Sequence, residues 1–283
     1  MKLSVFTVAT PDMGPGELAA AARKAGLHGI EWRCQDVPEN RRNEAPSFWG
    51  NNRCSIPTRW EEADLAAFRE AAAGSGMESI AVVPYLKPGD FEALERVLKA
   101  ARYLGAKMIR LGVHGYDRSR PFPELFADQK TYLKRAEELC GSYGVKGIIE
   151  IHHGTIAASA SAAYRLVEDR DPDRIGVLFD PGNMVYEGYE NHRMGLELLG
   201  PYLAHVHVKN AQWTRSGETR EDGFDRWLCG WAGLTRGIVD WPQVVADLKA
   251  VGYNGYIGVE DFSGEFESGE MLANFSAVMN RLL

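Results

Sequence analysis

Val177-Leu178-Phe179-Asp180 is a short apolar run that ends in an acidic residue. Three other runs have the same form and also end in a residue that can bind a metal ion: Ile148-Ile149-Glu150, His205-Val206-His207 and Ile257-Gly258-Val259-Glu260. Glu150, Asp180 and His207 follow one another at gaps of about 30 residues, which is one strand-plus-helix unit of a (β/α)8 barrel of roughly 250 residues. Parallel barrel strands end around one mouth, so these side chains are predicted to converge there.

The rest of the chain supports this architecture, because short apolar runs alternate with longer amphipathic ones. Eight candidate strands fall near residues 3–8, 28–33, 79–84, 107–113, 147–152, 175–180, 203–208 and 255–261. Helical spacing of apolar residues is found over Gly16–Ala25, Glu61–Ala73, Phe91–Leu104, Glu124–Tyr143, Ile156–Val167 and Trp241–Val251. Gly26, Gly105 and Gly252 stand where helices are expected to end. We therefore predict an α/β protein, a single-domain (β/α)8 TIM barrel over residues 1–283.

The amino-acid composition and net charge disfavour several classes of function. The hydrophobic share of 45% and the charged share of 25% are typical of a soluble globular protein, and a net charge of −7 argues against binding to a nucleic-acid backbone. Four scattered cysteines without a CxxC pair indicate neither a thiolate zinc site nor a redox dithiol. No apolar run suits a signal peptide or a membrane span. A cytoplasmic protein without a membrane or nucleic-acid partner is expected.

The four strand-end residues are more informative as a set than singly. Alone, Asp180 before Pro181 is as readily a helix cap as a ligand. Together, three carboxylates at one mouth repel one another by about 4 kcal/mol per pair at about 4 Å and an effective dielectric of about 20. A divalent cation removes that cost; without one, some of these acids should be protonated or turned away. Glu150, Asp180, His207 and Glu260 are thus predicted to bind one Mn²⁺, Mg²⁺, Co²⁺ or Zn²⁺ ion.

Two further residues share a strand face with His207. His205 lies two residues earlier and is expected one layer deeper, as a hydrogen-bonded core histidine. Lys209 lies two residues later; it either offsets the carboxylate charge or donates a hydrogen bond to a substrate oxygen.

Two connections are unusually long, at residues 34–60 and 210–239. Both should rise on the catalytic face of the barrel, and both carry tryptophans, among them Trp49 and Trp231. They are expected to act as lids or to contact substrate; the alternative is packing against each other or against another subunit. A homo-oligomer is therefore one expectation.

The motifs around these residues resemble those of the xylose isomerase-like barrels, the AP endonuclease family 2 superfamily, which holds sugar isomerases and epimerases as well as endonuclease IV-type enzymes. The motifs are Gly29-Ile30-Glu31, Glu150-Ile151-His152-His153-Gly154, Asp180-Pro181-Gly182-Asn183, His205-Val206-His207-Val208-Lys209, Gly237-Ile238-Val239-Asp240-Trp241-Pro242 and Gly255-Tyr256-Ile257-Gly258-Val259-Glu260-Asp261-Phe262. The resemblance implies one divalent ion on the four predicted ligands, with Glu150 and Glu260 also moving protons, and His152 orienting a substrate hydroxyl.

The chain departs from the family pattern at two positions. The seventh-strand lysine is usually followed by Asp, and here it is followed by Asn210; some epimerases carry His where this chain has Asn183, which puts a substrate contact there in doubt. The three-zinc site of the nuclease branch also needs His at position 183 and an Asp-x-His pair, and Asp225-Arg226-Trp227 offers none. Phosphodiester cleavage is thereby disfavoured.

The leading hypothesis is a metal-dependent isomerase or epimerase of a ketose or keto-sugar. One glutamate, Glu150 or Glu260, would take a proton next to the carbonyl and the other would return one, through a metal-stabilised enediolate. Residues expected at the substrate, a small and unphosphorylated carbohydrate, are His152, Lys209, Asn183, His114 and Arg236, and Tyr85 should face the mouth. The alternative is a lyase that dehydrates a keto-cyclitol or dehydroshikimate; a non-catalytic sugar-binding barrel is a third hypothesis.

Overall fold

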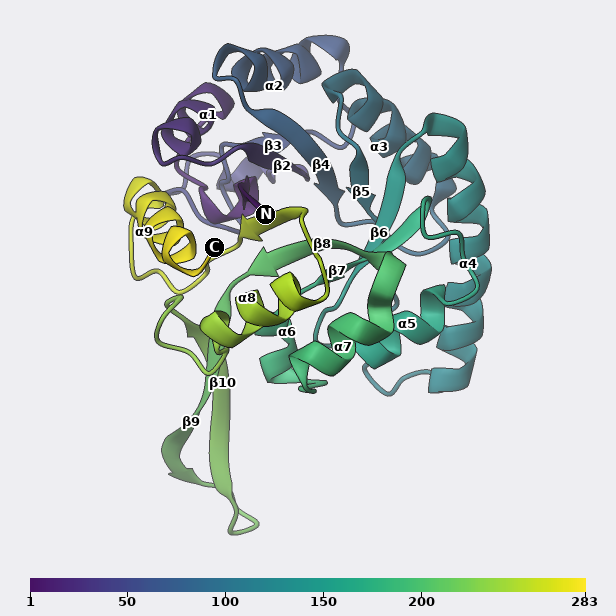
Figure 1. Cartoon of the computed structure of the whole chain (residues 1–283), viewed down its shortest axis with the longest axis vertical. Helices are drawn as coiled ribbons and strands as arrows, with labels where there is room; N and C mark the ends of the chain where they lie inside the picture. The colour runs from purple at the N-terminus through teal and green to yellow at the C-terminus, as the bar shows by residue number, and fades with distance from the viewer.

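Eight parallel strands close into a barrel in the computed structural model, which describes residues 1–283 (Figure 1). The strands are β1 (Lys2–Phe6), β2 (Gly29–Cys34), β4 (Glu78–Pro84), β5 (Met108–Arg110), β6 (Lys146–Glu150), β7 (Ile175–Phe179), β8 (Leu203–Val208) and β11 (Tyr256–Val259). Each pairs in parallel with the next along the chain, and β1 pairs with both β2 and β11 to close the ring. All eight predicted strands are confirmed, and with them the single-domain TIM barrel.

Helices surround the barrel. They are α1 (Pro15–Lys24), α2 (Glu62–Gly74), α3 (Phe91–Leu104), α4 (Phe122–Tyr143), α5 (Ala160–Val167), α6 (Pro181–Tyr186), α7 (His192–Leu199), α8 (Trp241–Ala250) and α9 (Ser268–Leu282). The six predicted helices are present, and Gly26, Gly105 and Gly252 follow three of them with positive φ as expected. The fifth begins at Ala160 rather than Ile156, because the Ser159 side chain accepts from the Ala162 amide and caps it there.

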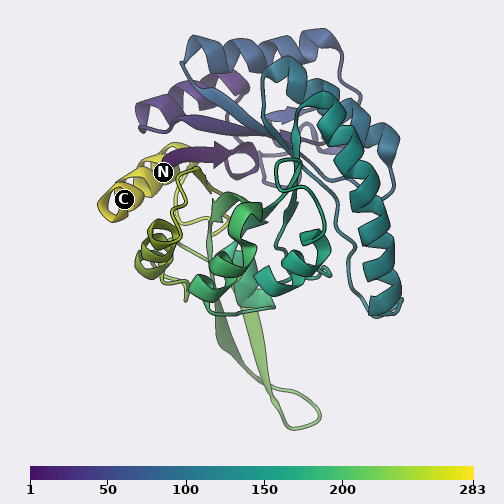
Figure 2. The ribbon, with the colours of Figure 1, turned by 45° about the vertical axis from the view of Figure 1, so that its right-hand side comes forward.

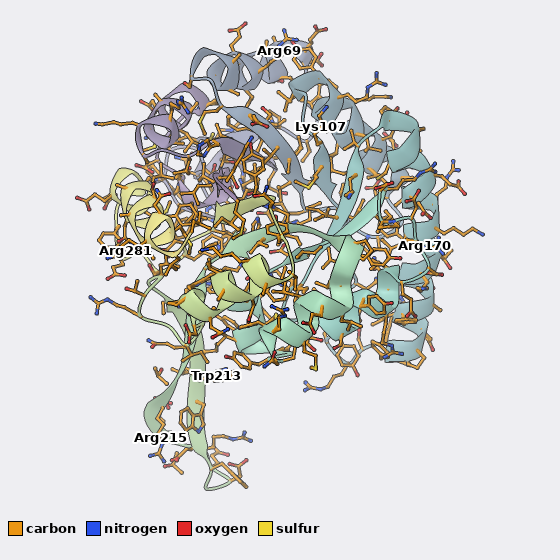
Figure 3. The ribbon with its side chains drawn as sticks, viewed as in Figure 1. Arg69, Lys107, Arg170, Trp213, Arg215 and Arg281 are labelled. Atoms are coloured by element: carbon orange, nitrogen blue, oxygen red, sulfur yellow. The ribbon has the colours of Figure 1, made fainter.

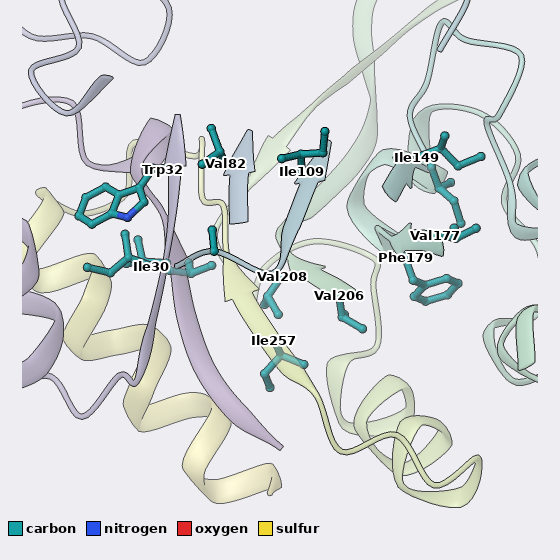
Figure 4. Close-up of a cluster of buried hydrophobic side chains, with 14 of the residues drawn as sticks. Ile30, Trp32, Val82, Ile109, Ile149, Val177, Phe179, Val206, Val208 and Ile257 are labelled. Atoms are coloured by element: carbon teal, nitrogen blue, oxygen red, sulfur yellow. The ribbon is translucent and has the colours of Figure 1, made fainter. Parts of the chain in front are cut away.

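Successive side chains of each strand point alternately towards the surrounding helices and into the barrel. One set packs between sheet and helices in a cluster of 64 buried residues, some of which Figure 4 shows along the strands. Trp32 of β2, for example, meets Phe68 of α2 edge to face, with ring centroids 5.2 Å apart. The other set points into the barrel, where five apolar residues form a small second cluster. Ile148 and Leu178 also point inward, and polar residues such as Glu31, His205 and His207 occupy other inward positions, so the upper part of the barrel interior can hold a site.

The two long connections have different structures. Residues 34–60 include the short strand β3 (Ser55–Ile56), which pairs with β2. Residues 210–239 contain an antiparallel hairpin of β9 (Asn210–Thr219) and β10 (Asp225–Ala232), which projects away from the barrel in Figures 1 and 2. Trp213 and Arg215 lie on this projecting part (Figure 3). The outer hairpin is therefore no lid over the mouth, and only its base reaches the cavity, through Trp231.

None of the helices combines the length and the apolar character that a bilayer-spanning segment needs.

Candidate metal centre and cavity

The four predicted ligands converge at the carboxyl ends of the strands. Glu150 ends β6, Asp180 directly follows β7, His207 lies in β8, and Glu260 directly follows β11. All four are buried, and one potential ligand atom from each lies within 4.8 Å of those of the others. Asp180 is also the N-cap of α6, since its Oδ1 accepts from the Asn183 amide at 2.9 Å. Its cap and ligand roles are thus compatible, because Oδ2 is left for the cluster.

His207 presents a free nitrogen to the three carboxylates. Its Nε2 lies 2.9 Å from Glu31 Oε2, and because an ionised carboxylate only accepts hydrogen bonds, Nε2 must carry the proton. Its Nδ1 makes no hydrogen bond and lies 3.4 Å from Glu260, 3.6 Å from Glu150 and 3.8 Å from Asp180 oxygens. Burial acts to lower the pKa of His207, but Glu31 and Glu260 outweigh it and raise that pKa well above its usual range, so Nδ1 is the nitrogen that would give up a proton to bind a metal ion while Nε2 stays bonded to Glu31.

Glu31, on β2, is the residue that fixes this tautomer. It is fully buried, and its second oxygen lies 2.9 Å from His205 Nε2 and accepts from the Ser4 hydroxyl at 3.4 Å. Burial alone would raise the pKa of Glu31, but His205 and His207 outweigh it and hold that pKa well below its usual range. Position 258 has to be glycine, because a Cβ there would overlap Glu31 Oε1. His205 is the buried, deeper histidine that was expected.

Charge within the cluster is unevenly balanced. The Lys209 ammonium contacts Glu260 and lies 2.9 Å from Asp180 Oδ2, and Arg110 Nη1 lies 2.5 Å from Glu150 Oε2. Even so, burial raises the pKa of Asp180 to about 7, and Glu150 and Glu260 add to the rise. Burial also acts to raise the pKa of Glu150, but the Arg110 guanidinium outweighs burial and leaves the pKa of Glu150 well below its usual range. One acid of the cluster therefore tends to keep its proton, as expected for carboxylates this close together without a divalent cation.

These donors fit a divalent cation. His207 Nδ1 is buried and has no hydrogen-bond partner, which is unusual for a buried polar atom, and Asp180 Oδ2 lies 3.8 Å from it with the Lys209 ammonium as its neighbour. Three carboxylates and one imidazole match the oxygen-rich sets that hold magnesium or manganese and also suit zinc or cobalt. Glu31 would supply the outer hydrogen bond that orients a ligating histidine.

A cavity of about 510 Å³ opens beside the cluster. Glu150, Glu260 and Lys209 line its charged part together with Arg110 and His152. The rest of the wall includes four aromatic residues: Trp49, Tyr85, Trp231 and Phe262. Both long connections thus contribute one tryptophan to the cavity.

The predicted substrate residues divide into two groups. His152 and Lys209 line the cavity, whereas Asn183 lies fully buried behind it and donates to Glu150 Oε1 at 3.2 Å. The structure does not bring His114 or Arg236 to the cavity lining. β5 ends at Arg110, so His114 lies four residues into the following loop, and Arg236 points into solvent with Nε 2.8 Å from Glu265. The His114 expectation rested on a fourth strand that was placed to end too far along the chain, whereas Arg236 is held outside the cavity by its ion pair with Glu265.

Sequence reasoning missed Arg110 and left Glu31 without a role. Both are charged residues within otherwise apolar strands, Met108-Ile109-Arg110-Leu111 and Gly29-Ile30-Glu31-Trp32. A charge at such a position must be paired, because burying an isolated charge is very costly. That signal was available, although the partners, Glu150 for Arg110 and His207 for Glu31, are distant in sequence.

Asn210, one of the two departures from the family pattern, has a structural role. Its Nδ2 donates to the Leu234 and Val239 carbonyls at 2.9 and 3.2 Å, and its Oδ1 accepts from the Val239 amide at 2.9 Å. An aspartate could not make the two donor contacts. The side chain therefore ties the end of β8 to the loop that follows the hairpin.

Known proteins that are similar to this chain in sequence include inosose dehydratases. An inosose dehydratase of Geobacillus thermodenitrificans (strain NG80-2) is 25% identical over 269 residues, 84% of this chain and 89% of that protein. Another, of Geobacillus kaustophilus (strain HTA426), is 30% identical over 135 residues, which span 45% of this chain and 42% of that protein.

Solved structures share the fold across the whole chain. A D-allulose 3-epimerase from Methylomonas sp. superposes with a TM-score of 0.73 and 14% identity, covering 100% of this chain and 98% of that one. A probable 3-DHS dehydratase from Bacillus anthracis superposes with a TM-score of 0.71 and 16% identity, covering 99% of this chain and 99% of that one. An IOLI protein with a bound zinc atom superposes with a TM-score of 0.71 and 17% identity, covering 99% of this chain and 97% of that one.

A model of the xylose isomerase-like TIM barrel family matches residues 19–278, which includes all four predicted ligands. The chain belongs to the xylose isomerase-like TIM barrel family.

Proposed function

We propose that this protein is a divalent-metal-dependent lyase that dehydrates a small polyhydroxylated ketone, such as a keto-cyclitol. The observation that carries the proposal is that the carboxylates of Glu150 and Glu260 accept different numbers of hydrogen bonds. Glu150 accepts from Arg110 on one oxygen and from Asn183 on the other. Glu260 contacts Lys209 through Oε2 only, and its Oε1 makes no hydrogen bond within the protein. Glu260 is thus the better base, and dehydration needs one base where a two-base epimerisation needs two.

The chain's own residues provide the remaining parts of an elimination. Glu260 takes the proton from the carbon next to the carbonyl, and the carbon–oxygen bond to the β-hydroxyl breaks as the double bond forms. His152 donates its Nδ1–H to the His153 carbonyl at 2.7 Å, which orients its ring. In the imidazolium form, which carries a second proton on Nε2, it can deliver that proton to the departing hydroxyl and is left as the neutral imidazole. Lys209 holds positive charge beside the base. A divalent cation on the four ligands would supply Lewis acidity that polarises the substrate carbonyl.

An isomerase or epimerase is the second candidate, and one observation favours it. Both Glu150 and Glu260 line the cavity, as an enzyme that removes and returns protons on two sides of its substrate requires. The similarity to inosose dehydratases over 84% of the chain favours the lyase, whereas the fold alone is shared with epimerases and dehydratases alike.

The test follows both reactions at once. The manganese-loaded protein is incubated in heavy water with a panel of ketoses and keto-cyclitols, and mass spectrometry follows each compound. Loss of water supports the lyase; deuterium at carbon without loss of water supports the isomerase or epimerase instead. Glu260→Gln should slow the reaction by about 10²-fold or more, the usual contribution of a general base, with metal binding measured in parallel because Glu260 is also a predicted ligand. Full turnover by Glu260→Gln would contradict the base assignment.

Three further properties belong to the same proposal. The bound ion is manganese, magnesium, cobalt or zinc; the bound zinc in a structural relative is consistent with this range. Four unpaired cysteines fit a reducing cytoplasmic location. A homo-oligomer fits the exposed Phe224, Trp227 and Leu228 of the hairpin, and sedimentation measurements test it.

A further inference from the structure

The cavity has more room and more aromatic surface than one sugar ring needs. A six-carbon keto-sugar has twelve non-hydrogen atoms and fills roughly 200 Å³ at the packing density of molecular solids, well under half of the cavity's 510 Å³. The charged residues of the proposed reaction occupy one part of the wall. We use the name aromatic rim for the four rings of the other part: Trp49, Tyr85, Trp231 and Phe262.

The aromatic rim is continuous although its residues come from four separate segments of the chain. Trp49 contacts two of the other rings, with its ring centroid 6.0 Å from that of Tyr85 and 5.2 Å from that of Phe262. Phe262 in turn lies 5.7 Å from Trp231. These separations are those of contacting aromatic pairs, so the four rings form one apolar surface.

The rim is joined to the reaction centre at its inner rings. Lys209 Nζ lies 5.1 Å from the centre of the Trp231 ring and 5.4 Å from that of Phe262, and Arg110 lies 4.6 Å from Tyr85. Trp49 has no cation against its ring, and 54% of its surface is exposed. A large aromatic side chain left this open at a cavity edge contributes little to folding and offers a free face to a ligand.

We propose that the aromatic rim is a second subsite, which stacks on a ring attached to the reacting ring, so that the substrate is a glycoside whose polyhydroxylated ketone ring is the one that reacts. The keto ring lies against Glu260, Lys209 and His152, and its attached ring lies over Trp49. Flat aglycones and the C–H face of a second sugar both suit such a surface, because aromatic rings attract apolar and aromatic faces. The assignment of the inner ring rests on the proposed function; the binding preference of the rim does not.

The experiment compares two glycosides that carry no ketone and are therefore not turned over. Isothermal titration calorimetry measures phenyl β-glucoside and methyl β-glucoside binding to the manganese-loaded protein. The phenyl compound should bind about 2- to 12-fold more tightly, because a contacting aromatic pair adds attraction beyond that of its buried area. Trp49→Ala should remove the difference, and Trp49→Phe should keep most of it.

Trp227→Ala is the matched control. Trp227 is 52% exposed, close to the exposure of Trp49, but it lies on the outer hairpin against Arg215 and does not line the cavity. Its replacement should leave both affinities unchanged, and thermal melting confirms the fold of each variant.

Three results would overturn the proposal: equal affinities for the two glycosides, equal weakening of both by Trp49→Ala, or no binding of either at its solubility limit. Equal weakening would mean that Trp49 only covers the first ring. Because no turnover is measured, an inactive substrate panel would reject the proposed function without affecting this result.

Discussion

Replacing Glu31 by glutamine tests whether the metal centre is oriented from the layer beneath it. The carboxylate is fully buried and lies 2.9 Å from both His205 Nε2 and His207 Nε2. Glutamine keeps the shape of the side chain but can accept from only one of the two rings, and it turns an NH2 group towards the other. The His207 tautomer with a free Nδ1 is then no longer enforced.

The expected loss follows from the position of Glu31 outside the ligand set. Removing a carboxylate that orients a ligating histidine usually costs 10- to 100-fold in metal affinity, about 1.4–2.7 kcal/mol. Calorimetric titration with manganese measures this directly, and the absorption spectrum of the cobalt form reports any change in ligand geometry. Ser4→Ala is the control, because its hydroxyl reaches the same carboxylate at 3.4 Å and a bond of that length contributes little.

Wild-type manganese affinity in Glu31→Gln, with an unchanged melting temperature, would refute this reasoning. A large loss in Ser4→Ala would also count against it, since any disturbance of the barrel interior would then weaken metal binding. A selective loss in Glu31→Gln would support the predicted role of His207 as a ligand.

Three further predictions concern stability. Gly258→Ala should destabilise the protein by about 1–3 kcal/mol in urea unfolding and weaken manganese binding, because the new Cβ overlaps Glu31 Oε1; wild-type values for both would contradict this. Asn210→Asp should cost about 1–3 kcal/mol, since the new side chain cannot donate to the Val239 carbonyl, and urea unfolding above pH 6 measures it. The folded-state pKa of Asp180, about 7, lies above its ordinary 3.8, so the native state holds the extra proton between these values. The metal-free protein should therefore lose stability as pH rises from about 4 to about 7, and manganese should raise the melting temperature more at pH 7 than at pH 5; equal shifts would refute this.

The sequence predicted the barrel well because its evidence is local and repeated. Each strand is a short apolar run, each helix shows its own spacing, and glycines with positive φ end several helices. Convergence of Glu150, Asp180, His207 and Glu260 then follows from the topology, since all four stand at the carboxyl ends of parallel strands.

The parts that escaped prediction depend on contacts between distant segments. Arg110 is recognisable as a site residue only through its ion pair with Glu150, forty positions away. Arg236 was predicted as a substrate contact, but it pairs with Glu265, which comes from another loop, and the sequence does not show that pairing. The hairpin also escaped prediction. Its polar and aromatic residues do not alternate regularly, and the backbone pairing of β9 with β10 alone defines it. The side chain that a long loop delivers to a cavity cannot be derived from its composition.

The alternation of side chains along the strands has a consequence for how such a barrel changes over evolutionary time. Ile149 and Glu150 are adjacent in β6, yet one packs in the core under the helices and the other faces the cavity. Substitutions in the two environments share few partners, so their effects on stability and on catalysis should be nearly additive. New substrate preferences can then be acquired at the mouth while the packed shell stays as it is, and one scaffold can diversify into many enzymes without being redesigned.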